Sequence, residues 1–255
     1  MGLRFASLGS GSRGNALLVE AGSTRVMLDC GFSLRVVETR LGRLGLSAEE
    51  VDAVLVTHEH ADHIQGVSRF AARYRIPVWC TGGTAEALEP RDEVTVHNVL
   101  PEAPFSIGDL QIHPFTVPHD AREPCQFRFT DGAFSLGVLT DAGHCTPHLK
   151  RELDDLDGLF LETNHDRRML AAGPYPPSLK RRVAGDYGHL SNCQAAALLE
   201  TIRCDRLQHI VCAHLSDRNN HPDLARSALA EVLECTPEWV GVAHQERGLP
   251  WREIR

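Results

Sequence analysis

A dense run of metal-binding side chains follows a strand-like segment early in the chain. Residues 55–66, LVTHEHADHIQG, place three histidines and an aspartate within six positions, directly after the apolar run VDAVLV. Neutral imidazole nitrogens and carboxylate oxygens are ligands that borderline transition metals prefer, and the lack of cysteine in the run argues against an iron–sulfur or purely structural thiolate site. The run predicts half of a metal centre, with the candidate ligands His58, His60, Asp62 and His63.

The composition is that of an ordinary soluble protein. The 255 residues are 42% hydrophobic and 24% charged, and no linker or repeat divides them, so we expect one α/β domain over residues 1–255. No apolar stretch of signal-peptide length and no run of about 18 apolar residues occurs, which indicates a cytoplasmic protein with no membrane partner. The formal charge of −8 excludes a protein coated in positive potential but leaves room for a local basic groove.

Strand-like and helix-like runs alternate along the chain. Four early runs read as strands, at residues 3–9, 15–21, 24–30 and 51–57. Helical periodicity covers residues 34–45 and 63–75. Turn dipeptides at 108–109 and 131–132 predict hairpins, the second with a two-residue loop because Asp-Gly suits two positive φ angles. Further strands and helices follow, so we expect two strand-rich halves to pack as a sandwich of sheets covered by helices.

Three isolated candidate ligands follow later strand-like runs. His119 ends FTVPH, Asp141 ends GVLTD, and His214 ends IVCAH. Side chains at strand ends can leave the packed interior while the sheet keeps their backbone fixed, so ligands from distant parts of the chain can meet at one rim. Taken alone, His119 or His214 is more often a buried histidine that satisfies a core hydrogen bond than a metal ligand. The combination with the histidine run is what indicates a metal site.

The full order of these motifs resembles the metallo-β-lactamase fold hydrolases. HxHxDH is followed by a lone His, a lone Asp and a lone His, each after a strand, and the likeness covers essentially the whole chain. It implies an αββα sandwich of two mixed sheets flanked by helices, with two divalent ions, Zn²⁺ or Mn²⁺. It assigns one ion to His58, His60 and His119, the other to Asp62, His63 and His214, and makes Asp141 the bridge.

The same resemblance bears on domain organisation and on one supporting residue. Too few residues separate Asp141 from His214 for the β-CASP domain that RNase J inserts, so we expect no such insertion. Asp29, which ends VMLDC, matches an aspartate that supports the site in the family, although a turn carboxylate is an almost equal alternative. Two divalent metals about 3.5–4 Å apart can share a hydroxide and clamp an ester or phosphodiester oxygen, so a hydrolase is expected.

Three polar loops narrow the resemblance. GSGSRGN at 9–15, GHLSN at 188–192 and HLSDRNN at 214–220 offer short side chains or backbone donors that can contact phosphate without reading bases. The predicted phosphate-binding residues are Ser10, Ser12, Asn15, Ser191, Asn192, Ser216, Asn219 and Asn220.

With the histidine run, these loops resemble the YycJ (WalJ) group, whose relatives include tRNase Z and RNase J. The group's association with 5′ to 3′ DNA exonuclease activity implies a nucleic-acid substrate, with DNA favoured over RNA, and a place in DNA repair or processing. The resemblance also makes His189 a catalytic residue beside Asp62, either protonating the leaving group or contacting phosphate.

A basic stretch precedes the GHLSN loop. It supplies five possible nucleic-acid contacts: Arg167, Arg168, Lys180, Arg181 and Arg182. They could follow phosphates despite the negative net charge, while the plain alternative is a solvated helix surface.

The sequence therefore predicts a two-metal phosphodiesterase, foremost a 5′ to 3′ DNA exonuclease. The fold also hosts other chemistry, so a glyoxalase-II-like thiolesterase or lactone hydrolase is the enzymatic alternative. A non-catalytic nucleic-acid-binding protein is the alternative from another class, which the complete ligand set disfavours. Histidine and carboxylate accept Zn²⁺ and Mn²⁺ alike, and the oligomeric state stays open.

Overall fold

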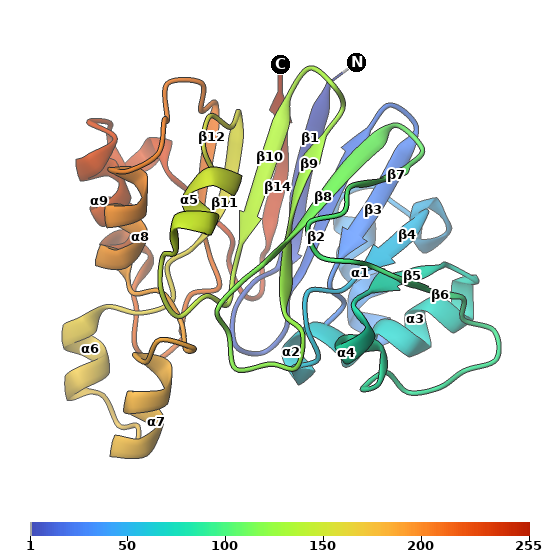
Figure 1. The fold of residues 1–255 in the computed structure, drawn as a ribbon, viewed down its shortest axis with the longest axis horizontal. Helices are drawn as coiled ribbons and strands as arrows, with labels where there is room; N and C mark the ends of the chain where they lie inside the picture. The colour runs from blue at the N-terminus through green and yellow to red at the C-terminus, as the bar shows by residue number, and fades with distance from the viewer. Residues whose placement is uncertain (1) are drawn as a thin grey trace.

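Two seven-stranded sheets pack face to face in the computed structural model, which describes residues 2–255 (Figure 1). The first sheet has the order β14-β1-β2-β3-β4-β5-β6. Its strands are β1 (Leu3–Gly9), β2 (Ala16–Ala21), β3 (Thr24–Leu28), β4 (Ala53–Leu55), β5 (Val78–Cys80), β6 (Val96–Asn98) and β14 (Leu249–Ile254). Strands β14 to β3 pair antiparallel, and β3 to β6 pair parallel.

The second sheet has the order β13-β12-β11-β10-β9-β8-β7 and is mixed in the same way. Its strands are β7 (Phe105–Ile107), β8 (Leu110–Thr116), β9 (Cys125–Thr130), β10 (Ser135–Leu139), β11 (Gly158–Glu162), β12 (His209–Ala213) and β13 (Gly241–Val242). Strands β7 to β10 pair antiparallel and β10 to β13 pair parallel. The chain thus runs in the same direction in β8, β10, β11 and β12, so these four strands end at one rim.

Helices flank the two sheets (Figure 1). They are α1 (Leu34–Arg43), α2 (Ala61–Ile64), α3 (Val67–Tyr74), α4 (Gly82–Ala85), α5 (Pro147–Glu152), α6 (Arg167–Ala172), α7 (Pro177–Val183), α8 (Asn192–Leu199) and α9 (Pro222–Val232), with short 3₁₀ turns at Ala48–Glu50 and Pro237–Trp239. The predicted αββα sandwich is confirmed. Among residues 2–255, no helix combines the length and the apolar character that crossing a bilayer requires.

The strands are apolar on both faces because each sheet lies between a second sheet and a layer of helices. In β1, Leu3 and Phe5 pack between the sheets, while Leu8 packs with Val37 and Leu41 of α1. This alternation follows from the two-residue period of a strand. The buried apolar layer between the sheets keeps the strand ends in fixed positions.

Two local predictions are wrong in detail. Residues 63–75 do not form one amphipathic helix but are split between α2 and α3 at Gly66, where an added Cβ would lie 2.0 Å from the Phe32 carbonyl oxygen. The Asp131-Gly132 pair does not close a two-residue hairpin. Only Gly132 has a positive φ, 93°, and the loop spans residues 131–134, because the Asp131 carboxylate accepts the backbone N–H groups of Ala133 and Phe134.

Candidate metal centre

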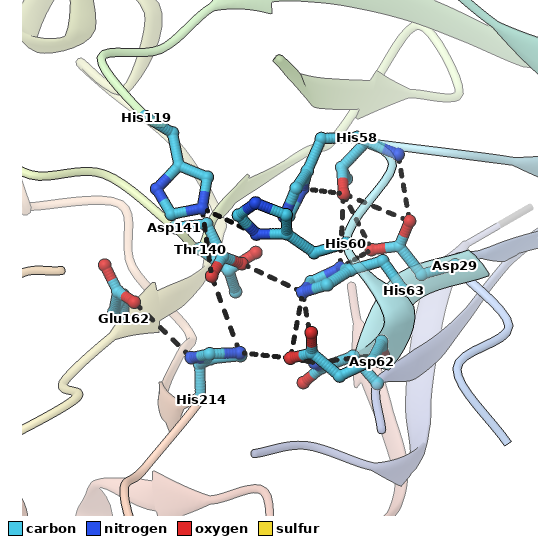
Figure 2. Close-up of polar contacts among 12 residues, drawn as sticks. Asp29, His58, His60, Asp62, His63, His119, Thr140, Asp141, Glu162 and His214 are labelled. Carbon is cyan, nitrogen blue, oxygen red and sulfur yellow. Dashed lines mark hydrogen bonds and ion pairs between the residues drawn. The ribbon is translucent and has the colours of Figure 1, made fainter. Parts of the chain in front are cut away.

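The seven predicted ligands meet at the rim where strands of both sheets end (Figure 2). The segment after β4 supplies four of them, with Asp62 and His63 on the short helix α2. The other three come from the loops after β8, β10 and β12, which share this rim because their strands run in the same direction. Residues up to 156 positions apart in the chain are thereby gathered into three overlapping groups of donor atoms, each group within 4.8 Å.

One group contains three imidazoles, from His58, His60 and His119. Their ring centroids are 4.6–5.0 Å apart, and Nε2 of His119 lies 3.2 Å from Nδ1 of His60. Nδ1 of His119 lies 3.1 Å from the Gly188 carbonyl oxygen, and Nδ1 of His58 lies 3.0 Å from the Thr57 hydroxyl. These contacts orient both rings from behind and direct each Nε2 toward the shared space.

A second group contains Asp62, His63 and His214. Oδ2 of Asp62 lies 3.4 Å from Nε2 of His63 and 3.3 Å from Nε2 of His214. Asp29 accepts a hydrogen bond from Nδ1 of His63 at 2.8 Å and the Thr57 backbone N–H at 2.9 Å. Because β3 and β4 are parallel neighbours, Asp29 ends beside the histidine run, and it supports His63 from outside the ligand group.

Asp141 lies between the two groups. Its Oδ2 is 3.3 Å from Nε2 of His63, and its Oδ1 is 3.5 Å from Nε2 of His214 and 4.0 Å from Nε2 of His119. Asp29, Asp141 and His214 all have φ between 52° and 61°, a conformation that side chains other than glycine rarely adopt. Such backbone strain persists where packing over-determines it, and here it turns three strand ends toward one point.

The two groups differ in electrostatics. Burial and the neighbouring imidazoles hold the pKa of His58 well below its usual range, and burial lowers the pKa of His119. Burial also opposes protonation of His63 and His214, but facing carboxylates overcome it and raise the pKa of His214 to about 10. The three-histidine group therefore offers neutral lone pairs, whereas the second group pairs imidazoles with negative charge.

The donor set fits a bound cation. Nε2 of His58 is buried and finds no hydrogen-bond partner among residues 2–255, and Oδ2 of Asp141, also without a hydrogen bond there, has only the ion pair with His63 at 3.3 Å. A buried acceptor without a partner costs about 1–3 kcal/mol, and a divalent ion between these atoms would remove that cost. Imidazole nitrogens and carboxylate oxygens without thiolate are suited to Zn²⁺ and Mn²⁺.

Glu162, which we did not single out in the sequence, is the main addition from the structure. It ends β11 and is fully buried. Oε1 lies 2.9 Å from Nδ1 of His189, and Oε2 accepts the backbone N–H groups of Ala142 and Leu190. Burial alone would raise its pKa, but the charge of His189 and hydrogen bonds from His189 and His214 lower it. The run GLFLE carried the same signal as the other strand ends: a polar side chain after an apolar strand.

His189 lies above the ligands, with its ring centroid 5.3 Å from those of His119 and His214. Burial works against its protonated form, but Glu162 and Asp141 raise the pKa of the ring. Since Nδ1 is directed at Glu162, Nε2 is the nitrogen available to a bound molecule. His189 lines a cavity of about 180 Å³ over the candidate ligands, together with His60, Asp62 and Arg182. A larger hollow of about 590 Å³, beside both chain ends, contains none of the seven candidate ligands.

The predicted phosphate-binding residues serve mostly inside the fold. Ser10 accepts the backbone N–H of His214 at 2.8 Å, and Asn15 donates to Oδ2 of Asp62 at 3.2 Å. The remaining buried members hold neighbouring loops: Ser191 caps α8, Asn192 and Asn220 bond to each other, and Ser216 bonds to Asn219. Of the eight, Ser12 lines the cavity over the ligands.

Helix α7 divides the predicted basic cluster. Arg182 lines the cavity over the ligands and forms an ion pair with Asp120 at 2.5 Å. Arg167, Lys180 and Arg181 line a separate recess of about 440 Å³ with His165 and Gln194. Arg168 lies exposed on α6. The cluster therefore offers one cation to the metal site and three to a neighbouring surface.

Comparison with known proteins settles the family. A model described as a beta-lactamase superfamily domain matches residues 24–211. The chain belongs to this superfamily. It is 36% identical to the exodeoxyribonuclease YycJ of Bacillus anthracis, over 96% of this chain and 94% of that one. It is 32% identical to the exodeoxyribonuclease WalJ of Streptococcus pneumoniae, over 95% and 92%.

The fold comparison agrees with the sequence comparison. The crystal structure of the metallo-beta-lactamase fold protein YhfI from Bacillus subtilis superposes with a TM-score of 0.78, at 17% identity and over 99% of both chains. The resemblance predicted from the sequence is confirmed. The fold family and the His/Asp groups together indicate a centre for divalent metal.

Proposed function

We propose that the protein is a two-metal-dependent 5′ to 3′ DNA exonuclease. The observation that carries the proposal is the coincidence of a complete His/Asp ligand set with near full-length similarity to two exodeoxyribonucleases. The cavity over the ligands has a cation, Arg182, and a polar group, Ser12, in its wall, as a phosphodiester requires. DNA is favoured over RNA because both relatives are named for DNA cleavage.

The candidate ligands form two groups, one for each ion. His58, His60 and His119 would hold one Zn²⁺ or Mn²⁺, and Asp62, His63 and His214 would hold the other, while Asp141 lies between the two groups. When bound, such ions supply a hydroxide at neutral pH and stabilise negative charge on phosphate oxygens. Asp62 reaches both histidines of its group and lines the cavity, so it both holds metal and faces the substrate.

His189 provides the proton for the departing oxygen. Nδ1 is held by Glu162, so the ring is oriented with Nε2 toward the cavity. A proton donor in this position protects the leaving alkoxide from developing full negative charge. Glu162 acts as a positioning residue, because its other oxygen is fixed by two backbone N–H groups and cannot turn away.

The recess behind α7 binds the part of the DNA chain that lies beyond the cleaved bond. Arg167, Lys180 and Arg181 line it, and α7, whose diameter is about 10 Å, separates it from the cavity. Phosphates along a strand repeat within that distance, so one chain of DNA can reach both places. The contacts concern phosphates and carry no base information.

A single panel of substrates tests the proposal. Metal-loaded protein is incubated with 5′-labelled DNA, RNA of the same sequence, a thioester and a lactone, with Asp141→Asn as the inactive control. Release of 5′ nucleotides from DNA faster than from the other three supports the proposal. Faster turnover of the thioester or the lactone would establish the glyoxalase-II-like or lactone hydrolase alternative. Binding of DNA without any turnover would establish a non-catalytic nucleic-acid-binding protein.

A further inference from the structure

Helix α7 is an unusual element because none of its seven residues, all within the described part of the chain, is buried. Its contacts with the rest of the chain include the Arg182–Asp120 ion pair, a hydrogen bond of 2.6 Å from Nζ of Lys180 to the Ala171 carbonyl, and the His189 N–H to the Val183 carbonyl. A helix whose side chains are at most partly buried contributes little to the core. Core packing therefore does not explain why α7 lies against the cavity.

The face of α7 that borders the cavity is largely apolar. Leu179 and Val183 line the cavity, and their spacing of four residues puts them on one side of the helix. The rest of the cavity lining is mostly polar or charged, and includes Arg182 of the same helix as well as Asp62 and His214. A phosphate alone has no use for an apolar wall. The wall fits a molecule in which a flat apolar part is attached to the phosphate.

Tyr187 lies next to two residues that line the cavity, because it precedes Gly188 and its carbonyl accepts the N–H of Asp120. Its side chain is 62% exposed, although it directly precedes Gly188 and His189, which line the cavity. The backbone at this position is fixed: the Tyr187 carbonyl accepts the N–H of Asp120 at 3.1 Å, and the His189 N–H donates to Val183 at 2.9 Å. Gly143 packs against the same peptide, 2.5 Å from the Tyr187 nitrogen to its ideal Cβ position. An exposed ring on a fixed backbone is a ready surface for stacking.

We infer that Leu179, Val183 and Tyr187 bind the nucleobase of the nucleotide being cleaved, an inference that rests on the proposed nuclease activity. The cavity of about 180 Å³ is smaller than the roughly 300–1,000 Å³ that encloses a whole drug-sized ligand, so it does not enclose an entire nucleotide. Leu179 and Val183 carry no hydrogen-bonding side-chain atoms, and every base has a π-face for Tyr187. The surface requires a base but does not select among the four.

The test compares variants on paired DNA substrates. The first DNA carries an ordinary 5′-terminal nucleotide, and the second carries an abasic one. Tyr187→Ala raises KM on the ordinary DNA by about 5- to 150-fold, the range for loss of one base stack, and Tyr187→Phe restores it. On the abasic DNA, wild type and Tyr187→Ala differ by less than about twofold, because no base is present to stack. Exchange of the terminal base among the four leaves the wild-type KM nearly constant.

Trp239→Ala is the matched control, because Trp239 is another exposed aromatic, 43% exposed, on the 3₁₀ turn at Pro237–Trp239. It leaves both substrates unaffected. Wild type that cleaves neither DNA overturns the nuclease and the base surface together. Wild type that cleaves ordinary DNA, with Tyr187→Ala equal to it, overturns the base surface alone. An equal loss in Tyr187→Ala on both DNAs also overturns the base surface, because the ring would then act independently of the base.

Discussion

Asp157 and Glu162 are buried carboxylates at opposite ends of the same strand, since Asp157 directly precedes β11 and Glu162 ends it. Asp157 meets a guanidinium: Nη2 of Arg206 lies 2.8 Å from each of its oxygens, and the Ser135 N–H donates at 2.8 Å. Glu162 meets imidazoles instead, with Oε1 2.9 Å from His189 and 3.5 Å from His214. The two carboxylates on this strand therefore have different partners: a guanidinium at Asp157 and imidazoles at Glu162.

The difference lies in what the partner can do. A guanidinium remains protonated at every pH a protein meets, so the pair at Asp157 is a fixed structural contact. An imidazole can give up its proton or coordinate a metal, so the pairs at Glu162 leave chemistry available. Asp157 is paired with a guanidinium, whereas Glu162 faces imidazoles whose charge can change.

Removing the central carboxylate of the rim gives the largest expected effect. Asp141→Asn keeps the shape of the side chain, and Asn tolerates the φ of 56° better than most residues. It removes the negative charge placed between the two ligand groups, so DNA hydrolysis falls by about 10⁴-fold or more while the fold persists. Elemental analysis of chelator-free protein checks the cause: wild type contains about two divalent ions per chain and the variant fewer. Active, folded wild type without metal would refute the two-ion site.

Loss of His189 tests the chemical partner of Glu162. His189→Ala lowers kcat on DNA by about 10²–10⁴-fold, the usual range for a positioned acid, with metal content near that of wild type. The loss shrinks on a nitrophenyl phosphodiester, because nitrophenolate departs without a proton. A variant that instead loses one ion would make His189 a ligand and reopen the assignment of His214.

Glu162→Gln removes the charge but keeps the size of the buried side chain. Because Glu162 orients His189, kcat on DNA falls by about 10- to 100-fold, typical for a residue that supports a catalytic group. The double variant with His189→Ala is no slower than His189→Ala alone, since Glu162 acts through that ring. Additive losses would instead assign Glu162 a separate role at the metal centre.

Glu162 also shows which parts of the site can be predicted from the sequence and which cannot. His58, Asp141 and the other five candidate ligands were identifiable because each follows an apolar strand in a known order, and the parallel strands bring those ends to one rim. Ser10 and Asn15 were expected to face phosphate, yet Ser10 binds the backbone of His214, 204 residues away. Glycine-rich polar loops look alike whether they bind a ligand or another loop, and only the distant partner decides between the two.

The helices show the same limit: local sequence patterns predict an element but not its contacts with distant segments. Local periodicity predicted α1 well, because its buried residues recur along one face. It missed the break at Gly66, where the backbone N–H donates to the Cys30 carbonyl of another segment at 2.7 Å instead of continuing the helix. It also could not reveal that α7 separates Arg182 from Arg181, so that neighbouring cations in the sequence serve different surfaces.

The three cations that line the recess behind α7 can be tested by substitution. Replacing Arg167, Lys180 and Arg181 by alanine weakens DNA binding and reduces the slope of log K against log salt by roughly 2–3 units, about 0.7–0.9 for each lost phosphate contact. The matched control replaces Arg35, Arg69 and Arg73, exposed arginines on α1 and α3, with the same change in net charge. Equal effects in both triple variants would show that net charge alone attracts DNA and that the recess is ordinary surface.

Substitution of Asp157, at the other end of β11, has the smallest expected effect on catalysis. Asp157→Ala leaves the N–H of Ser135 without its acceptor, so the free energy of unfolding falls by about 1–3 kcal/mol. DNA hydrolysis at a temperature well below the transition stays within about twofold of wild type, because no ligand or cavity residue contacts Asp157. Urea unfolding and initial rates on the same preparation measure the two quantities. The reverse pattern, unchanged stability with a large loss of rate, would mean that the two ends of the strand are coupled and that the division between scaffold and chemistry is false.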